Sequence, residues 1–479
     1  MIVERASYNW AYSEDIPGSR CGPEDGPWPR PYQVLSEGEL WRELRTLAKP
    51  QTSQLGKEGK FKADSINFQP SPTTKTQDRY VVTQLEVNGR LWAFTGVFDG
   101  HLGDVTVEHV AHHLPIIVRD FLREAESVSG PGKLTPESIS ELFTKAIMAF
   151  DDAIAHDVLD LFGGSVDKLS EYTDAQIREI INDQHKGGAN WRKARLCMYG
   201  TTALVALVDP EHKDLWIANL GDCQAIMASP GNNAKDWNIE VLTTNHNGDN
   251  DAELDRVRKT HPGEPECIMD RRVLGALAPT RCFGDIPFKQ PPAFTRRILY
   301  NLFPGFHNTS PWEEFLVRNQ TPPYITAEPQ IIHRRLDGDD ACPSVPPTNT
   351  TLSEDNSRSS SRSSITKNLF WSGNKTSQQQ QQSLTPLPRF LILASDGFTD
   401  LCNGEGQKRI IESWARGMVS SNPPETVTDA APGSRQDNMA LRLLRRAVGG
   451  EDRFGVSRVL TLDMDVAWID DTSIVVQTL

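Results

Sequence analysis

Five aspartates share one kind of position in this chain: each stands at the start or the end of an apolar, β-like run. They are Asp78, Asp99, Asp222, Asp396 and Asp470, and several of them are followed or preceded by glycine. Asp-Gly is also the commonest turn dipeptide, so any one of them alone is more often a turn residue than a ligand. Strands packed in two sheets, however, bring their ends to a common rim, where acids distant in sequence converge. The set therefore predicts one acidic site.

The chemistry of such a site follows from its ligands. Oxygen ligands without a cluster of Cys or His suit a hard, octahedral cation such as Mg²⁺ or Mn²⁺. A pair of these ions activates a water near neutral pH and clamps a phosphoryl oxygen. His101 stands two residues after Asp99 and is placed to protonate a leaving oxygen, although a histidine there is otherwise an ordinary turn residue. The pattern predicts metal-assisted hydrolysis of a phosphate ester.

A hairpin positions the first two acids. The alternating runs 80–87 and 91–98 are joined by Asn88-Gly89, a pair typical of a two-residue turn because both turn positions need positive φ. A two-residue turn returns the chain antiparallel, so the residues that flank the open end of the hairpin meet. We therefore expect Asp78 and Asp99 to lie side by side.

The remaining elements are read from their periodicity. Apolar spacing near 3.6 predicts a helix over 105–121, which Pro115 should kink or break. The other predicted helices cover 37–47, 141–161, 169–182, 251–259, 408–418 and 439–448. β-rich runs predict strands over 201–208, 214–220, 224–227, 239–243, 390–394 and 473–477.

Two interruptions divide the second half of the chain. Residues 286–323 are rich in proline and aromatic side chains, and residues 338–388 are rich in Ser, Pro and Gln. The second segment has too few apolar residues to form a core. Its cluster Leu369-Phe370-Trp371 could dock a partner, and a solvated loop is the simpler interpretation.

Composition excludes several classes of function. The net charge of −14 disfavours partnership with nucleic acid or an anionic membrane, and no apolar run approaches the ~20 residues of a membrane span. The seven cysteines are scattered without a Cys-x-x-Cys pair, which indicates reduced thiols in an intracellular protein. The first residues show neither a secretory signal nor the acid-poor composition of a mitochondrial presequence.

Seven motifs occur in an order that resembles the metal-dependent protein phosphatases of the PPM (type 2C) family. They are Gln77-Asp78-Arg79, Val97-Phe98-Asp99-Gly100-His101, Tyr199-Gly200-Thr201-Thr202-Ala203, Gly221-Asp222, Phe283-Gly284-Asp285, Ala394-Ser395-Asp396-Gly397 and Asp470-Asp471. The resemblance covers residues 64–479 and leaves 1–63 as an N-terminal extension. It implies an α+β fold, with a central β-sandwich of two antiparallel sheets flanked by α-helices.

Within this family the chain is similar to the pyruvate dehydrogenase phosphatases. The similarity lies in Ala278–Asp285, Pro322–Pro329, Arg445–Gly450 and the position of the 286–323 insertion. It implies a phosphoprotein substrate, with the E1 component of pyruvate dehydrogenase as the leading candidate, and a mitochondrial location in place of a cytoplasmic one. A general phosphatase of another pathway, or a catalytically weak binding scaffold, is the alternative.

The resemblance also implies a role for each acid. Asp99 would bridge two Mg²⁺ or Mn²⁺ ions, Gly100 would lend its carbonyl, and Asp78 would order a water on the metal. Asp396 and Asp470 would complete the ligands, Asp222 and Asp400 match the positions of a third metal, and His101 matches the general acid. Asp437-Asn438-Met439 looks like a competing motif for Asp470, but Asp437 is better interpreted as a helix N-cap.

Two residues depart from the family pattern. Gln77 stands where a glutamate is usual, which removes one negative charge near the metals. Thr73 occupies the position of the phosphate-binding arginine found in many members, an arginine that the pyruvate dehydrogenase phosphatases also lack. The phosphate anchor is therefore open, with Lys75 and Arg79 as candidates.

Overall fold

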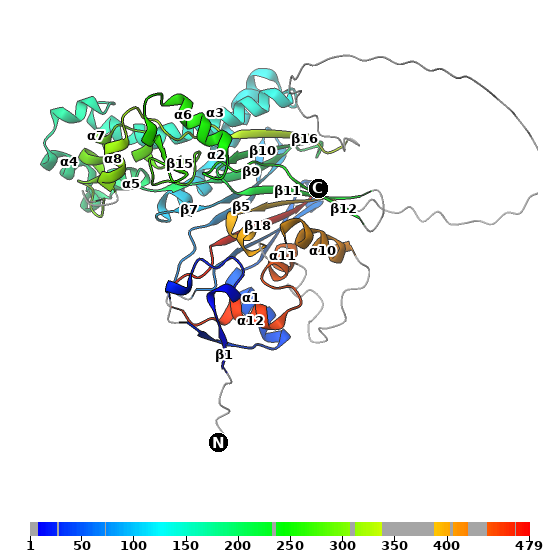
Figure 1. Ribbon diagram of the computed structural model, residues 1–479. Coiled ribbons are helices and arrows are strands. Elements are labelled where there is room, and N and C mark those ends of the chain that lie inside the picture. Colours follow the sequence, from blue (N-terminus) through cyan, green and yellow to red (C-terminus); the bar gives the residue numbers. More distant parts are fainter. Residues whose placement is uncertain are drawn as a thin grey trace, which may run out of the picture. The chain divides into compact units, whose positions relative to one another are not determined.

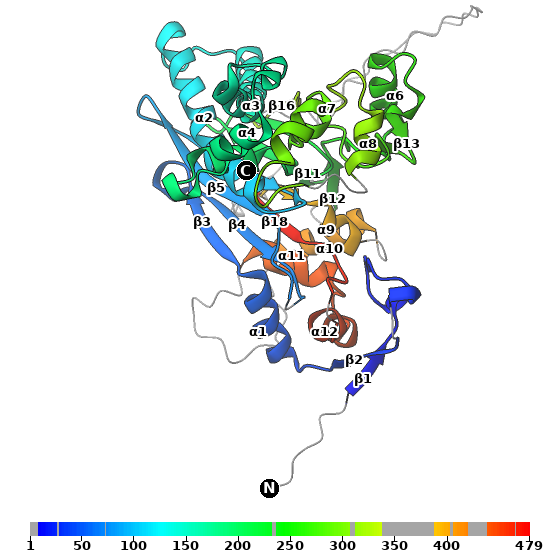
Figure 2. The ribbon, with the colours of Figure 1, turned by 90° about the vertical axis from the view of Figure 1, so that its left-hand side faces the viewer.

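Two antiparallel β-sheets lie face to face in the computed structural model, and helices cover both outer faces (Figures 1 and 2). The structure describes residues 8–25, 28–71, 73–231, 236–306, 312–337, 388–402, 406–419, 438–464 and 466–479. The predicted α+β sandwich is thus confirmed. The insertion predicted at 338–388, with its Leu369-Phe370-Trp371 cluster, lies outside the described residues up to 387.

The first sheet has five strands in the order β16-β10-β9-β6-β5. Its strands are β5 (Arg79–Val87), β6 (Arg90–Phe98), β9 (Ala203–Val208), β10 (Asp214–Leu220) and β16 (Gln330–Arg335). The predicted hairpin is present: Asn88 and Gly89 have φ of 50° and 77°, and Arg79 pairs with Phe98 at its open end. Local turn chemistry alone accounts for this register.

The second sheet has six strands in the order β12-β11-β17-β18-β4-β3. Its strands are β3 (Gln51–Leu55), β4 (Phe61–Phe68), β11 (Gln224–Pro230), β12 (Trp237–Val241), β17 (Phe390–Ala394) and β18 (Thr472–Thr478). The boundary predicted between residues 63 and 64 falls inside β4, and β3 precedes it, so the sheet begins within the predicted extension. Apolar side chains from both sheets fill the space between them, among them Val97, Leu204, Leu393 and Val475.

Helices α2 (Val105–Ser129) and α3 (Pro136–Leu159) pack on the outer face of the first sheet. The structure contradicts a break at Pro115, because α2 continues through it for more than three further turns. Pro115 is buried on the apolar face of the helix with Leu114 and Val118, and this packing offsets the lost backbone hydrogen bond. Thr135 caps α3 by accepting a hydrogen bond from the Ser138 amide.

The outer face of the second sheet is covered by helices from both ends of the chain. These are α1 (Glu37–Ala48), α9 (Asp396–Leu401), α10 (Gln407–Val419), α11 (Met439–Ala447) and α12 (Arg453–Thr461). Ser36 and Glu39 form a capping box at the start of α1, whose Leu40 and Leu44 are buried against the sheet. The predicted cap Asp437 lies outside the described residues; Asn438 caps α11, and its Oδ1 accepts from the Leu441 amide.

The rest of the described chain forms shorter elements around the sandwich. They are β1 (Tyr8–Ala11), β2 (Arg30–Gln33), α4 (Asp174–Ile181), α5 (Ala189–Leu196), α6 (Asp251–Thr260), β13 (Ile268–Met269), β14 (Arg272–Val273), α7 (Pro292–Phe294) and α8 (Trp312–Arg318). Short 3-10 or π turns are η1 (Ser13–Asp15), η2 (Pro23–Asp25), η3 (Lys57–Gly59), η4 (Asp160–Phe162), η5 (Asp167–Glu171), η6 (Gln184–Lys186), η7 (Pro265–Cys267), η8 (Ile286–Phe288) and η9 (Thr295–Leu299). The helix predicted over 169–182 is therefore split into η5 and α4, because the chain is extended at the cap, Thr173.

A small sheet completes the architecture and joins three of the sequence motifs. Its strands are β7 (Gly100–His101), β8 (Gly200–Thr201) and β15 (Phe283–Gly284), in the order β15-β8-β7. Gly100 pairs with Thr201, and Gly200 pairs with both His101 and Gly284. Among the described helices none is long and apolar enough to cross a membrane, and the six described cysteines are buried free thiols.

Candidate active site

The two acids that flank the hairpin lie next to each other, as predicted. Asp78 precedes Arg79 and Asp99 follows Phe98, and these two neighbours are direct partners in the β5–β6 ladder. Asp78 is buried, with 1% of its surface exposed. The backbone of Asp99 is fixed from both sides, because its amide donates to Thr202 Oγ1 (3.2 Å) and its carbonyl accepts from the Thr202 amide (2.9 Å).

Three carboxylates from different strand ends converge at this rim. The nearest oxygens of Asp99, Asp222 and Asp396 all lie within 4.8 Å of one another. Asp99 ends β6, Asp222 stands in the tight turn between β10 and β11, and Asp396 follows β17 as the first residue of α9. The two sheets therefore bring together acids that are nearly 300 residues apart.

The carboxylates are crowded and buried, and both effects raise their pKa values. Burial raises the pKa of Asp99 well above its ordinary value, and the charges of Asp396, Asp78 and Asp222 raise it further. Burial followed by the nearby Asp396 raises the pKa of Asp222 to about 6. Burial raises the pKa of Asp78 to about 8 although its hydrogen bond with Ser395 opposes the shift. Without a cation the cluster favours bound protons over full ionisation.

The same residues fit a divalent cation. Asp78 Oδ2, Asp396 Oδ1 and Gln77 Oε1 are buried and have no hydrogen-bond partner among the described residues. A buried carboxylate oxygen left without a partner is costly, and ion coordination satisfies it. The donors are all oxygens, the ligand type that Mg²⁺ and Mn²⁺ prefer.

The C-terminal acids reach the same site. Asp470 and Asp471 line a cavity of about 410 Å³ together with Asp99, Gly100 and Asp396. The two carboxylates differ in their contacts. Asp471 accepts from the Gln77 amide (2.7 Å) and from Gln69 Nε2 (2.8 Å), whereas Asp470 Oδ2 is paired with the guanidinium of Arg20.

Asp400 stands one helical turn after Asp396 on α9 and is not among the described residues that line the cavity. Burial raises its pKa, the charge of Asp396 adds to the increase, and Arg20 opposes it. Asp400 is therefore electrostatically part of the cluster, although it stands behind the carboxylates that line the cavity.

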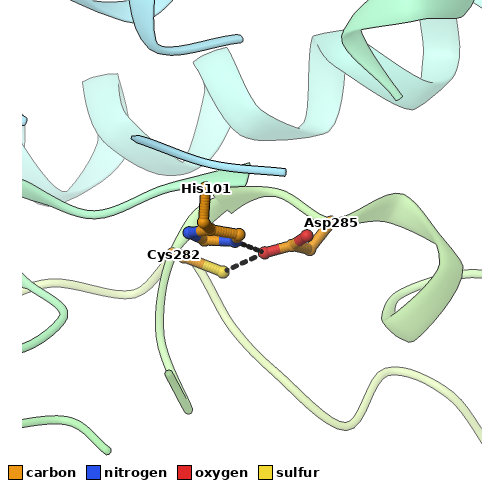
Figure 3. Close-up of side chains that lie close together, drawn as sticks. All are labelled: His101, Cys282 and Asp285. Carbon is orange, nitrogen blue, oxygen red and sulfur yellow. Dashed lines mark hydrogen bonds and ion pairs between the residues drawn. The ribbon is translucent and has the colours of Figure 1, made fainter. Parts of the chain in front are cut away.

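His101 is held by an aspartate to which the sequence assigned no role. His101 Nε2 lies 2.6 Å from Asp285 Oδ2, and the Cys282 thiol donates to the same oxygen at 3.1 Å (Figure 3). Burial lowers the pKa of His101, but the charge and hydrogen bond of Asp285 outweigh it, so the net shift is upward. The pair thus favours a protonated ring.

The local backbone makes room for this pair. Asp285 has φ of 48°, and its amide donates to the Tyr199 carbonyl at 3.0 Å. A Cβ on Gly200 would lie 2.0 Å from Asp285 Oδ2 and 2.3 Å from His101 Nε2, so only glycine is compatible with the contact. The Asp after Gly284 follows the same glycine–aspartate pattern as the metal candidates, and this was the signal that could have found it.

The two candidate phosphate anchors are engaged elsewhere. Lys75 is paired with Asp104 on the segment before α2, and Arg79 donates to Glu108 Oε1 at 2.7 Å. The arginines among the described residues that line the cavity are instead Arg20 and Arg272. Three aromatic side chains within the 286–323 insertion, Phe288, Trp312 and Phe315, line the same cavity.

An α+β sandwich with an all-oxygen acidic rim and an adjacent His–Asp pair defines a hydrolase site of the kind that uses divalent cations. The family profile described as Protein phosphatase 2C matches residues 77–342. The chain therefore belongs to the protein phosphatase 2C family, whose members are metal-dependent, and it is a protein serine/threonine phosphatase.

Curated relatives cover most of the chain at low identity. Pyruvate dehydrogenase (acetyl-transferring) phosphatase 1, mitochondrial, of Homo sapiens is 25% identical over 462 residues, which are 83% of this chain and 74% of that protein. The human phosphatase 2 of the same name is 26% identical over 450 residues, with the same two shares of 83% and 74%. A protein phosphatase 2C homolog of Schizosaccharomyces pombe is 25% identical over 447 residues, 89% of this chain and 82% of that protein.

Proposed function

We propose that this phosphatase hydrolyses phosphoserine and phosphothreonine in proteins with two Mg²⁺ or Mn²⁺ ions bound at the carboxylate rim. The observation that carries the proposal is the convergence of three carboxylates within 4.8 Å, one of which, Asp396, has a buried oxygen with no partner among the described residues.

Each acid has a proposed role. Asp99, Asp396 and Asp470, together with the Gly100 carbonyl, would hold the two ions. Asp78 would orient a water, and Asp222 and Asp400 would serve a third ion. When bound, the cations would supply an activated water and offset the negative charge of the phosphoryl oxygens.

His101 has the proposed role of general acid. The water oxygen forms a bond to phosphorus while the bond from phosphorus to the serine or threonine oxygen breaks. A proton from His101 Nδ1 goes to that leaving oxygen, and Nε2 keeps its hydrogen bond to Asp285 throughout. The products are inorganic phosphate and the free hydroxyl, without a covalent phosphoenzyme.

The E1 component of pyruvate dehydrogenase is the substrate that we propose first. Two human relatives carry names that state pyruvate dehydrogenase (acetyl-transferring) and a mitochondrial location, and each is matched over 74% of its length. A mitochondrial location of this chain is part of the proposal. A general phosphatase is the second candidate, favoured by the Schizosaccharomyces pombe relative, whose name states no substrate.

The test compares phosphorylated E1 with two unrelated phosphoproteins as substrates of the purified chain. We expect a higher kcat/KM for E1, and complete chelation of divalent cations should abolish turnover of all three. Equal rates on the three substrates would favour the general phosphatase. Activity that survives chelation, or a trapped phosphoenzyme, would contradict the mechanism itself.

A further inference from the structure

The site contains a cation from an unexpected part of the chain. Arg20 lies before β2, in the N-terminal segment that the motif pattern excludes from the catalytic domain. Its guanidinium lines the cavity with Asp99 and Asp396 and is paired with Asp470. The two partners are at opposite ends of the sequence.

The segment around Arg20 is fixed against the catalytic rim by its backbone. The Arg20 amide donates to the Trp468 carbonyl at 2.7 Å, two residues before Asp470. Gly18 packs on the backbone of Asp400 so closely that a Cβ would lie 2.8 Å from its carbonyl carbon. Ile16 and Cys21 are buried in the core on either side of this contact. The position of residue 20 is therefore built into the fold.

The side chain itself remains half-exposed, at 54% of its surface. A fixed backbone with an exposed guanidinium allows the tip to leave Asp470 when that carboxylate binds a cation. A substrate phosphate brings two further negative charges to a rim that is already acidic. Arginine matches phosphate oxygens with two parallel hydrogen bonds and stays protonated.

The other basic side chains nearby are less suited. Lys75 and Arg79 are paired with acids beside or on α2. Arg272 lines the cavity, but its Nη1 donates to the Ala276 carbonyl at 3.0 Å. This hydrogen bond ties the guanidinium to the segment that follows Arg272. Of these four side chains, Arg20 is the one paired with the carboxylate of a proposed metal ligand, whereas Arg79 donates to the backbone carbonyl of Asp78 at 2.7 Å.

We propose that Arg20 anchors the phosphate group of the substrate, the function that Thr73 leaves open in this chain. The inference rests on the proposed function, because the ligand is a phosphoserine or phosphothreonine dianion. It assigns the N-terminal segment to the active site: the segment supplies a substrate-binding residue. Product phosphate should bind to the same guanidinium.

The test uses the full chain with Arg20→Ala and Arg20→Lys. We expect Arg20→Ala to weaken competitive inhibition by inorganic phosphate and to raise the KM for a phosphothreonine peptide, each about 10-fold or more. The change in kcat should be smaller, and Arg20→Lys should recover part of the loss. Arg42→Ala is the matched control, since Arg42 is an exposed arginine of α1 that is not among the residues lining the cavity.

A second measurement separates anchoring from simple charge balance. Calorimetry should show that Mg²⁺-loaded wild-type chain binds inorganic phosphate and that Arg20→Ala binds it about 10-fold more weakly or not at all. Unchanged phosphate binding with tighter Mg²⁺ binding would overturn the proposal, because Arg20 would then only neutralise Asp470. A larger effect of Arg272→Ala than of Arg20→Ala on phosphate binding would overturn it as well.

The two proposals fail in different ways. If the wild-type chain hydrolyses no phosphopeptide, the proposed function fails, while phosphate binding still tests the anchor. If Arg20→Ala is not folded by circular dichroism, Arg20→Lys and Arg20→Met take its place in the binding experiment. Wild-type phosphate affinity in Arg20→Met would then overturn the anchor.

Discussion

Two groups of ionisable side chains lie at one rim of the sandwich. In one group the side chains pair with each other, and in the other they carry charges of the same sign. His101, Asp285 and Cys282 satisfy one another, with donor–acceptor distances of 2.6 and 3.1 Å. The nearest oxygens of Asp99, Asp222 and Asp396 all lie within 4.8 Å of one another, and burial raises the pKa values of the first two. The polar atoms of the His101 group are satisfied by one another. The carboxylate group needs an added positive charge to balance its negative charges.

The difference follows from how each group is built. The His101–Asp285 pair depends on backbone geometry close to it, namely the space at Gly200 and the left-handed conformation of Asp285. The carboxylate cluster depends on the ends of strands from two sheets. A group that supports catalysis by orientation gains from rigidity, whereas a group that binds ions must tolerate like charges until they arrive.

The largest effect is expected from Asp99→Asn. The substitution removes the charge that the proposed mechanism places between two ions, so turnover of a phosphopeptide should fall below detection. The metal-free fold should be equally or more stable, because burial and the neighbouring acids disfavour ionised Asp99. Activity assays check the expected loss of turnover, and thermal melts in chelator check the stability of the metal-free fold. Turnover at the wild-type rate would contradict the assignment of Asp99 to the metal site.

His101→Gln should lower kcat by about 10²-fold, the usual contribution of a general acid. The Mg²⁺ concentration needed for half-maximal activity should stay the same, since His101 belongs to the other group. The measurement is a metal titration of kcat for both proteins. A raised metal requirement with unchanged kcat would instead place His101 among the metal ligands.

Asp285→Asn should have a smaller effect, about 10-fold in kcat, because it acts through the orientation of His101. Asp285 holds the pKa of His101 above its ordinary value, so its loss should let the ring deprotonate at lower pH. The basic limb of the kcat–pH profile should then move to lower pH. Cys282→Ala removes only the thiol donor and is the control; a larger loss from it would contradict the assignment to Asp285.

The metal-free chain should lose stability as pH rises between about 4 and 8. Burial raises the pKa of Asp78 to about 8 and that of Asp222 to about 6, so the folded chain retains protons that the unfolded chain releases near pH 4. This stabilisation is fully present below pH 4 and is lost as pH passes the folded pKa values. The test is to measure the melting temperature across this pH range, once in chelator and once in Mg²⁺. Mg²⁺ should make the fall of the melting temperature with pH less steep. Parallel curves in the two conditions would contradict the prediction.

The smallest effect is expected from Asn438→Ala, which removes the cap of α11 far from both groups. Loss of an N-cap side chain costs about 1 kcal/mol of unfolding free energy, and activity should not change. The Met439 amide also donates to Asp64 Oδ2 at 2.6 Å, so part of the helix start stays satisfied. Urea unfolding beside a kcat measurement checks this. A clear loss of activity would mean that α11 positions the rim.

Much of the site could be predicted because its elements are locally encoded. Asn88-Gly89 fixes the hairpin and its register, so the adjacency of Asp78 and Asp99 needed no tertiary information. The fold class followed from motif order. The break expected at Pro115 came from a local rule, and packing of the buried face of α2 overrode it.

Other contacts of the site join segments whose sequences carry no sign of each other, and they follow only from the folded arrangement. The residue pattern predicted which aspartates flank strands, and their oxygen donors favoured a hard cation as the ligand. It did not determine that Asp285 holds His101, because that depends on β8 and β15 pairing through Gly200 and Gly284. Nor did it place Arg20 beside Asp470, since residues so far apart meet only when the sheets and the N-terminal segment have packed, and no periodicity of either segment records the partner.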